Sequence, residues 1–186
     1  MIILILIISS FILGFYFNGL LKDGLNDSYI DKLISITKSK KIPVFISGQT
    51  GYAKNIDVKI FYEDLNFSEN PKGTILLING AAETMIQWPE QMIRTLIKND
   101  FRVIRYDNRG LGQSDWIKKW SKRNDYNLEE MARDALAVTS HLMIKKFHII
   151  GYSTGGMIGQ ILAINHPEKI KTLTNLMSSG YLFDPE

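Results

Sequence analysis

A serine with a glycine two positions away on each side is the arrangement in this sequence most able to do chemistry. Ser153 lies between Gly151 and Gly155, after the apolar residues 147–150 and before residues 157–165, which have helical spacing. A G-x-S-x-G sequence between a strand and a helix is typical of a nucleophilic serine held on a sharp turn. The turn strains the serine backbone and leaves no space for side chains at the flanking positions, which glycine satisfies. The plain alternative is a glycine-rich turn in which Ser153 caps the helix.

Backbone amides near this serine are expected to stabilise the negative charge that acyl transfer creates. The N–H of Thr154 and the other N-terminal amides of the following helix should point toward Ser153. A second donor is expected at Ala81, in the sequence Asn-Gly-Ala-Ala of residues 79–82, which ends a buried apolar strand. Gly80 and its small neighbours let the backbone approach a ligand closely. The alternative is an ordinary loop between a strand and a helix.

A third motif follows the next expected strand. Residues 107–114 have the spacing D-x-R-G-x-G-x-S, and open α/β sheets bind ligands at the carboxyl ends of their strands. Asp107 and Arg109 are predicted to pair with each other and brace this loop beside the site, a structural rather than a catalytic role. Neither glycine-rich stretch resembles a phosphate-binding loop, because the G-K-[ST] and G-x-G-x-x-G patterns are absent.

Composition excludes several other classes of function. The chain has 186 residues, of which 45% are hydrophobic and 22% charged, as suits one globular domain. The net charge of +3 is scattered and does not indicate nucleic-acid binding. Cysteine is absent, which excludes disulfides, thiol nucleophiles and thiolate metal sites. The three histidines form no metal-binding pattern, so we expect neither a metal nor another cofactor.

Alternating strands and helices are predicted to position the three motifs. We expect a mostly parallel α/β sheet with helices on both faces and right-handed crossovers. Asn127 should cap one helix, with Glu130 completing a capping box. The expected strands are residues 58–62, 74–78, 101–106, 147–150 and 170–177, and the expected helices are residues 89–99, 127–142 and 154–166.

The N-terminal region is predicted to be separate from this domain, which we place at residues 50–186. Residues 2–21 carry no charge and are long enough to span a bilayer as a helix. We expect residues 1–21 to be an uncleaved transmembrane anchor; a signal peptide and a buried core helix are the alternatives. Residues 22–49 read as a polar lead-in with a short amphipathic helix at residues 29–36. Lysines follow the apolar segment and none precedes it, which favours a cytosolic domain, whereas a signal peptide would make it secreted or periplasmic.

The three motifs, in this order and spacing, resemble the α/β-hydrolase superfamily. The resemblance covers residues 50–186. Within the superfamily, the sequence is similar to bacterial esterase-like members, including the aclacinomycin methylesterase group. It implies that Ser153 is the nucleophile, that Ala81 and Thr154 supply the oxyanion-hole amides, and that Trp88 packs behind that loop. Many relatives have histidine in place of Asn79, a difference that a backbone contact should tolerate.

The sequence departs from the superfamily pattern after Ser153. In the superfamily, the acid and the histidine of the triad follow the serine in the sequence. In this sequence, 33 residues follow Ser153. His141 and His148 precede the serine, and His166 belongs to the end of the elbow helix. The resemblance therefore implies only the N-terminal part of such a domain, without the C-terminal strands and the lid.

Two functions are compatible with these observations. The first is a serine hydrolase that cleaves a carboxylic ester or related acyl bond of a small molecule through an acyl-enzyme on Ser153. It requires an acid and a base from a longer chain or from a complementing C-terminal polypeptide. The second is a non-catalytic, truncated hydrolase-like protein that binds a ligand or is a remnant. A related peptidase or C–C bond hydrolase is a lesser alternative, and no nucleic-acid partner is expected.

Overall fold

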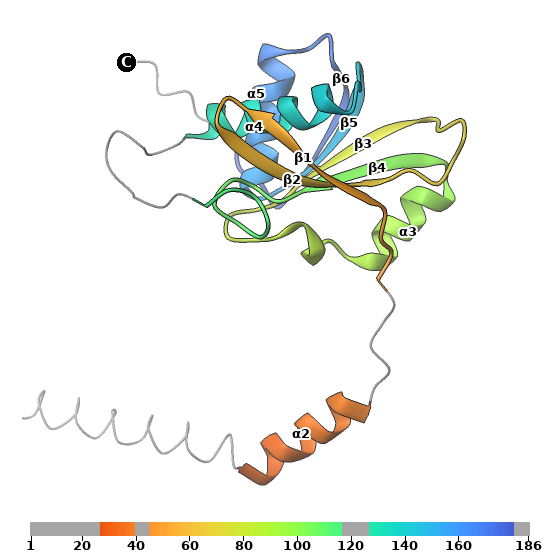
Figure 1. Cartoon of the computed structure of the whole chain (residues 1–186), viewed down its shortest axis with the longest axis vertical. Coiled ribbons are helices and arrows are strands. Elements are labelled where there is room, and N and C mark those ends of the chain that lie inside the picture. The colour runs from red at the N-terminus through yellow and green to blue at the C-terminus, as the bar shows by residue number, and fades with distance from the viewer. Residues whose placement is uncertain (1–26, 40–44, 117–126, 181–186) are drawn as a thin grey trace, which may run out of the picture. The chain divides into compact units, whose positions relative to one another are not determined.

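The computed structural model describes residues 27–39, 45–116 and 127–180 (Figure 1). Contacts between residues divide the chain into two units, residues 1–44 and residues 45–186. The elements are α2 (Asp27–Ser39), β1 (Gln49–Asn55), β2 (Val58–Leu65), β3 (Gly73–Ile78), the 3-10 helix η1 (Met85–Gln87), α3 (Glu90–Lys98), β4 (Phe101–Tyr106), α4 (Leu128–His141), β5 (Phe147–Tyr152), α5 (Thr154–Asn165) and β6 (Ile170–Leu176).

The second unit is built on a mixed sheet of six strands in the order β1-β2-β4-β3-β5-β6. The strands β4, β3, β5 and β6 are parallel, as predicted. The hairpin of β1 and β2 is antiparallel and joins the sheet through β4. The strand β1 was not predicted from the sequence, because only Ala53 of this strand is buried and its residues lack a clear apolar alternation.

Helices cover both faces of the sheet, as predicted. Alternate residues of β3 point in opposite directions: Leu76 and Ile78 pack in a core with residues of α4 and α5, whereas Ile75 and Leu77 pack with residues of α3 (Figure 1). The β3 side chains from Thr74 to Ile78 are all buried. This explains why the strand reads as a continuous apolar run.

Asn127 caps the start of α4 as predicted, but the Glu130 side chain does not complete the predicted capping box. The Asn127 side chain accepts a hydrogen bond from the Glu130 N–H at 3.0 Å. The Glu130 carboxylate lies near the guanidinium groups of Arg109 and Arg133, at 3.6 and 3.7 Å. The buried residues of α4 are Met131, Ala132, Asp134, Ala135, Val138 and Thr139.

The parallel register brings the three sequence motifs to one edge of the sheet. Ile78 at the end of β3 pairs with Gly151 of β5, and Leu77 pairs with Arg105 near the end of β4. The loops that follow these three strands therefore leave the sheet at the same side. This is the edge at which open α/β sheets hold ligands.

The first unit contributes α2, which includes the amphipathic helix predicted at residues 29–36 and is longer at both ends. Its Leu33, Ile34 and Ile36 side chains are exposed. Among the residues that the structure describes, no helix is long and apolar enough to cross a membrane. The predicted anchor at residues 1–21 lies outside them.

Candidate active site

Ser153 occupies a sharp turn between β5 and α5, in the strand–turn–helix context that the motif requires. Its backbone has φ 50° and ψ −118°, a conformation that residues with a side chain rarely adopt. A Cβ added at Gly151 would lie 2.4 Å from the Gly155 carbonyl oxygen, and one added at Gly155 would lie 2.0 Å from that of Ile78. No side chain fits at either position without a backbone shift. The two glycines therefore allow the start of α5 to pack directly on β3 and β5.

The backbone after β3 passes close to the serine. A Cβ added at Gly80 would lie 3.3 Å from Ser153 Cβ and 3.0 Å from the Tyr152 ring. Ala81, the next residue of this loop, is exposed, and Ala82 has a φ of 58°. Thr154 is the first residue of α5, so its N–H has no acceptor within the helix. The structure thus brings the loop of Ala81 and the start of α5 to the two sides of Ser153.

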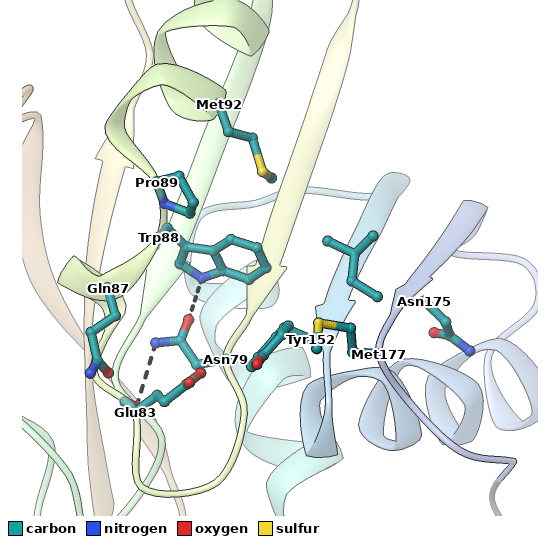
Figure 2. Close-up of a pocket in the computed structure, with 10 residues that line it drawn as sticks. Asn79, Glu83, Gln87, Trp88, Pro89, Met92, Tyr152, Asn175 and Met177 are labelled. Carbon is teal, nitrogen blue, oxygen red and sulfur yellow. Dashed lines mark hydrogen bonds between the residues drawn. The ribbon is translucent and has the colours of Figure 1, made fainter.

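Hydrogen bonds hold the loop after β3 in place. Asn79 is buried, and its side-chain oxygen accepts a hydrogen bond from the Trp88 indole N–H (Figure 2). The side-chain amide of Asn79 also donates to the main-chain carbonyl oxygen of Glu83 at 3.4 Å. The main-chain carbonyl of Asn79 accepts a hydrogen bond from Asn108 Nδ2 at 3.4 Å. Trp88 is 7% exposed. It therefore packs behind the loop, and its indole N–H also fixes the rotamer of Asn79.

Asp107 organises the neighbouring loop through backbone amides. Its two carboxylate oxygens accept hydrogen bonds from the N–H groups of Met85 at 2.8 Å and Gln113 at 2.9 Å. Gly112 has φ 50°, and a Cβ there would lie 2.0 Å from Asp107 Oδ2. The buried carboxylate thus ties the loop after β4 to the loop after β3.

Arg109 pairs with α4, which corrects the prediction that it pairs with Asp107. Its Nε and Nη2 donate to the two carboxylate oxygens of Asp134 at 2.6 and 2.7 Å. Asp134 is 1% exposed and also accepts a hydrogen bond from the Asn55 side chain at 2.7 Å. Both Asp107 and Arg109 therefore brace loops, but they do so through different partners.

None of the three histidines lies near Ser153. His148 precedes it by five residues along β5, or about 16 Å at 3.3 Å per residue. His166 follows the far end of the 12-residue helix α5, about 18 Å from its start. The His141 ring lies 5.6 Å from the ring of Tyr62 on β2, which is separated from β5 by two strands. The placement of all three agrees with the prediction that none serves as a base for Ser153.

A pocket of about 540 Å³ has Tyr152, the residue before the serine, in its wall (Figure 2). Tyr152 precedes Ser153 directly, and the Leu176 carbonyl accepts the Ser153 N–H at 2.9 Å, so both wall residues are fixed relative to the serine. The sequence analysis missed the pocket residue Glu83, whose carboxylate accepts the Gly80 N–H at 3.2 Å. The remaining walls are Asn79, Gln87, Trp88, Pro89, Met92, Asn175 and Met177.

The mixed sheet and the strained serine between two crowded glycines define an α/β hydrolase. A sequence model of that family, described as alpha/beta hydrolase fold, matches residues 73–186, more than half of the chain, and the chain belongs to this family. The match to rhodomycin D methylesterase DnrP of Streptomyces peucetius is 33% identical over 126 residues, which cover 68% of this chain and 41% of that protein.

Other relatives carry different descriptions. A putative carbamate hydrolase, RutD of Caulobacter segnis, is 30% identical over 61% of this chain and 41% of its own length. The crystal structure of a hydrolase from Pseudomonas aeruginosa PA01 superposes with a TM-score of 0.63 at 28% identity, covering 75% of this chain and 49% of that one. The chain spans about two fifths of the length of these curated relatives.

Proposed function

We propose that this protein contributes the nucleophile of a serine hydrolase that cleaves a carboxylic ester or a related acyl bond in a small molecule. The strained turn that presents Ser153 at the carboxyl edge of the sheet is the observation that carries this proposal. Relatives described as a methylesterase and a putative carbamate hydrolase support acyl-bond chemistry. Non-catalytic binding by a remnant of the fold is the alternative that the experiments below must exclude.

The proposed reaction passes through an acyl-enzyme. Ser153 Oγ bonds to the carbonyl carbon while its proton moves to a base, and the amides of Ala81 and Thr154 stabilise the oxyanion. The bond from carbon to the leaving oxygen then breaks, and that oxygen takes the proton. Attack by water on the acyl group releases the acid and restores the serine.

The base for this reaction is not among the three histidines of the sequence. We propose that an acid and a histidine come from further polypeptide that pairs with β6. Two observations support this part of the proposal: β6 pairs with β5 alone among the described strands, and the chain spans about two fifths of the length of its relatives. Loss of the triad histidine in such enzymes lowers kcat by about 10⁶, so we expect negligible turnover by the 186-residue chain.

A fluorophosphonate probe tests the nucleophile directly. The probe should label Ser153 slowly in the 186-residue chain, with the site assigned by peptide mass spectrometry, and Ser153→Ala should abolish labelling. Ser140→Ala is the matched control, because Ser140 is an exposed serine on α4. Labelling that is unchanged by Ser153→Ala, or absent even when a C-terminal polypeptide of a relative is supplied, would favour the non-catalytic alternative.

Turnover of a p-nitrophenyl ester tests the missing base. We expect hydrolysis to appear only when the complementing polypeptide is present and to depend on Ser153. Efficient turnover by the 186-residue chain alone, lost in Ser153→Ala, would contradict the proposal that the base comes from elsewhere.

We further propose that residues 1–21 anchor the protein in a membrane, with the hydrolase unit on the cytosolic side. The uncharged apolar composition of residues 2–21 supports this. The full chain should remain in the membrane fraction after extraction with carbonate, and deletion of residues 1–21 should release it. Recovery of the intact full-length chain in the soluble fraction would disprove the anchor.

A further inference from the structure

The carboxylate of Glu83 lies beside the nucleophile. Glu83 Oε2 would be 3.0 Å from a Cβ added at Gly80, and the same point would be 3.3 Å from Ser153 Cβ. The carboxylate accepts the Gly80 N–H at 3.2 Å, which fixes it on the loop that is proposed to carry the oxyanion donor. A substrate held by Ser153 would therefore have a negative charge close to its reacting end.

Among the lining residues that the structure describes, none is basic. Glu83 is the one acidic residue of that lining, and the other walls are apolar, aromatic or amide side chains. Among the residues that the structure describes, Lys72, Arg94, Arg102, Arg105, Arg109 and Arg133 form ion pairs with carboxylates, but none of them does so with Glu83. Because the side chain is half-buried, a cationic ligand that enters the pocket would complete an ion pair that is partly shielded from water.

Aromatic rings line the same space. Trp88 and Tyr152 are both pocket walls, and the Tyr152 ring lies 3.0 Å from the position of a Gly80 Cβ, as the Glu83 carboxylate does (Figure 2). An ammonium group gains energy over the face of tryptophan or tyrosine, and quaternary ammonium ligands bind in such aromatic surroundings. A carboxylate and two aromatic rings in the lining of one pocket suit a positively charged group better than a neutral or an anionic one.

We propose that Glu83 is a specificity-determining residue and that the pocket takes esters whose acyl or alcohol part carries an ammonium group. The ammonium group binds between the Glu83 carboxylate and the rings of Trp88 and Tyr152, while the ester carbonyl reaches Ser153. The ester part of this inference rests on the function proposed above. The preference for a cation does not, because it concerns binding to residues that are present in the chain.

Binding of two molecules of similar shape tests the preference without requiring turnover. Choline carries a quaternary ammonium group, and 3,3-dimethyl-1-butanol has an uncharged tert-butyl group in its place. We expect choline to bind the full chain about tenfold more tightly by calorimetry, corresponding to about 1.4 kcal/mol. High salt should reduce the difference, because a half-exposed ion pair is partly screened.

Two glutamate variants locate the effect. Glu83→Gln keeps an oxygen that can accept the Gly80 N–H and should remove most of the choline advantage, leaving the affinity for dimethylbutanol unchanged. Glu69→Gln makes the same change of charge at an exposed loop residue outside the pocket and should keep the advantage. Equal affinity of the two probes for the unmodified chain, no binding of choline at millimolar concentration, or a full advantage in Glu83→Gln would overturn the proposal.

The fluorophosphonate reaction separates this inference from the proposed function and from a second role for Glu83. A labelling rate of Ser153 that falls by no more than about tenfold in Glu83→Gln, together with lost choline preference, supports a role in specificity. A labelling rate that falls more than about tenfold in Glu83→Gln would assign the carboxylate to activation of the serine and overturn the proposal. Choline preference with no labelling of Ser153, even when the C-terminal polypeptide of a relative is supplied, would leave the cation site in place and favour the non-catalytic alternative.

Discussion

The two neighbours of β5 differ in how completely they are buried. On one side, β3 lies between β4 and β5, and its residues from Thr74 to Ile78 are all buried. On the other side, β6 pairs only with β5 among the described strands, and its side chains are half-buried or exposed. Met177, just after β6, is 84% exposed. The start of α5 packs tightly on β3, whereas β6, whose Leu176 carbonyl accepts the Ser153 N–H, has an open edge among the described strands at which further pairing is possible.

The largest effect should come from crowding the junction of α5 and β3. Gly155→Ala places a methyl group 2.0 Å from the Ile78 carbonyl oxygen, which belongs to the backbone and cannot move aside. Overpacking of a core typically costs about 1–3 kcal/mol and sometimes more. We expect at least about 3 kcal/mol here, measured as a loss of the free energy of unfolding in urea.

Gly180→Ala is the control for this substitution, because nothing lies within 4 Å of a Cβ at Gly180. It should leave stability within about 0.5 kcal/mol of the unmodified chain. If both variants unfold at the same urea concentration, the packing of α5 against β3 is looser than described.

Truncation of one leucine in each neighbouring strand compares β3 with β6 directly. Leu76 is fully buried, and Leu173 is half-buried against the same core. Leu76→Ala should cost about 2–5 kcal/mol, as expected for a large-to-small change in a packed core. Leu173→Ala should cost about 1 kcal/mol, because less of its surface leaves water on folding. Equal losses in thermal or urea unfolding would mean that β6 is covered as fully as β3.

Relief of the strain at the nucleophile should increase stability. Ser153 has φ 50° and ψ −118°, and such a conformation costs a residue with a side chain about 1–3 kcal/mol. Ser153→Gly should therefore raise the free energy of unfolding by about 1 kcal/mol while removing the nucleophile. Ser140→Gly, in the last turn of α4, should instead lower it by up to about 1 kcal/mol. A destabilised Ser153→Gly variant would show that the serine side chain makes compensating contacts.

The smallest effect concerns protonation at the start of β5. Partial burial lowers the pKa of His148 below its usual value, and the nearby positive charge of Lys171 lowers it further. The unfolded chain then binds a proton more readily than the folded one, so stability should decrease slightly as the pH falls through about 6.5. His148→Gln should weaken this dependence in urea unfolding at several pH values.

The strong local patterns of the sequence predicted most of the sheet and the turn of the nucleophile. The continuous apolar run of β3 and the glycines around Ser153 each have one simple structural explanation, and both predictions agree with the structure. The partner of Arg109 could not be predicted from a local pattern. Asp107 is two positions away but binds backbone amides, whereas Asp134 lies 25 positions away on a helix whose docking only the folded sheet determines.

Glu83 shows a second limit of the sequence. A single carboxylate in a loop has no periodicity and matches no motif, so nothing marks it among the other acidic residues. Its importance depends on its distance from Gly80 and Ser153 and on the uncharged side chains around it. Such a site becomes visible only when the fold brings the loop after β3 against the end of β5.

The contact of Asp134 with Asn55 also has a consequence for the synthesis of the chain. The hairpin of β1 and β2 can pair as soon as it emerges, but the helix that covers it follows much later, since the two residues are 79 positions apart. At about 5–20 residues per second, the ribosome needs roughly 4–16 s to add that length. During that interval the inner face of the hairpin, with Ala53 and Ile60, is available to chaperones and to other nascent chains.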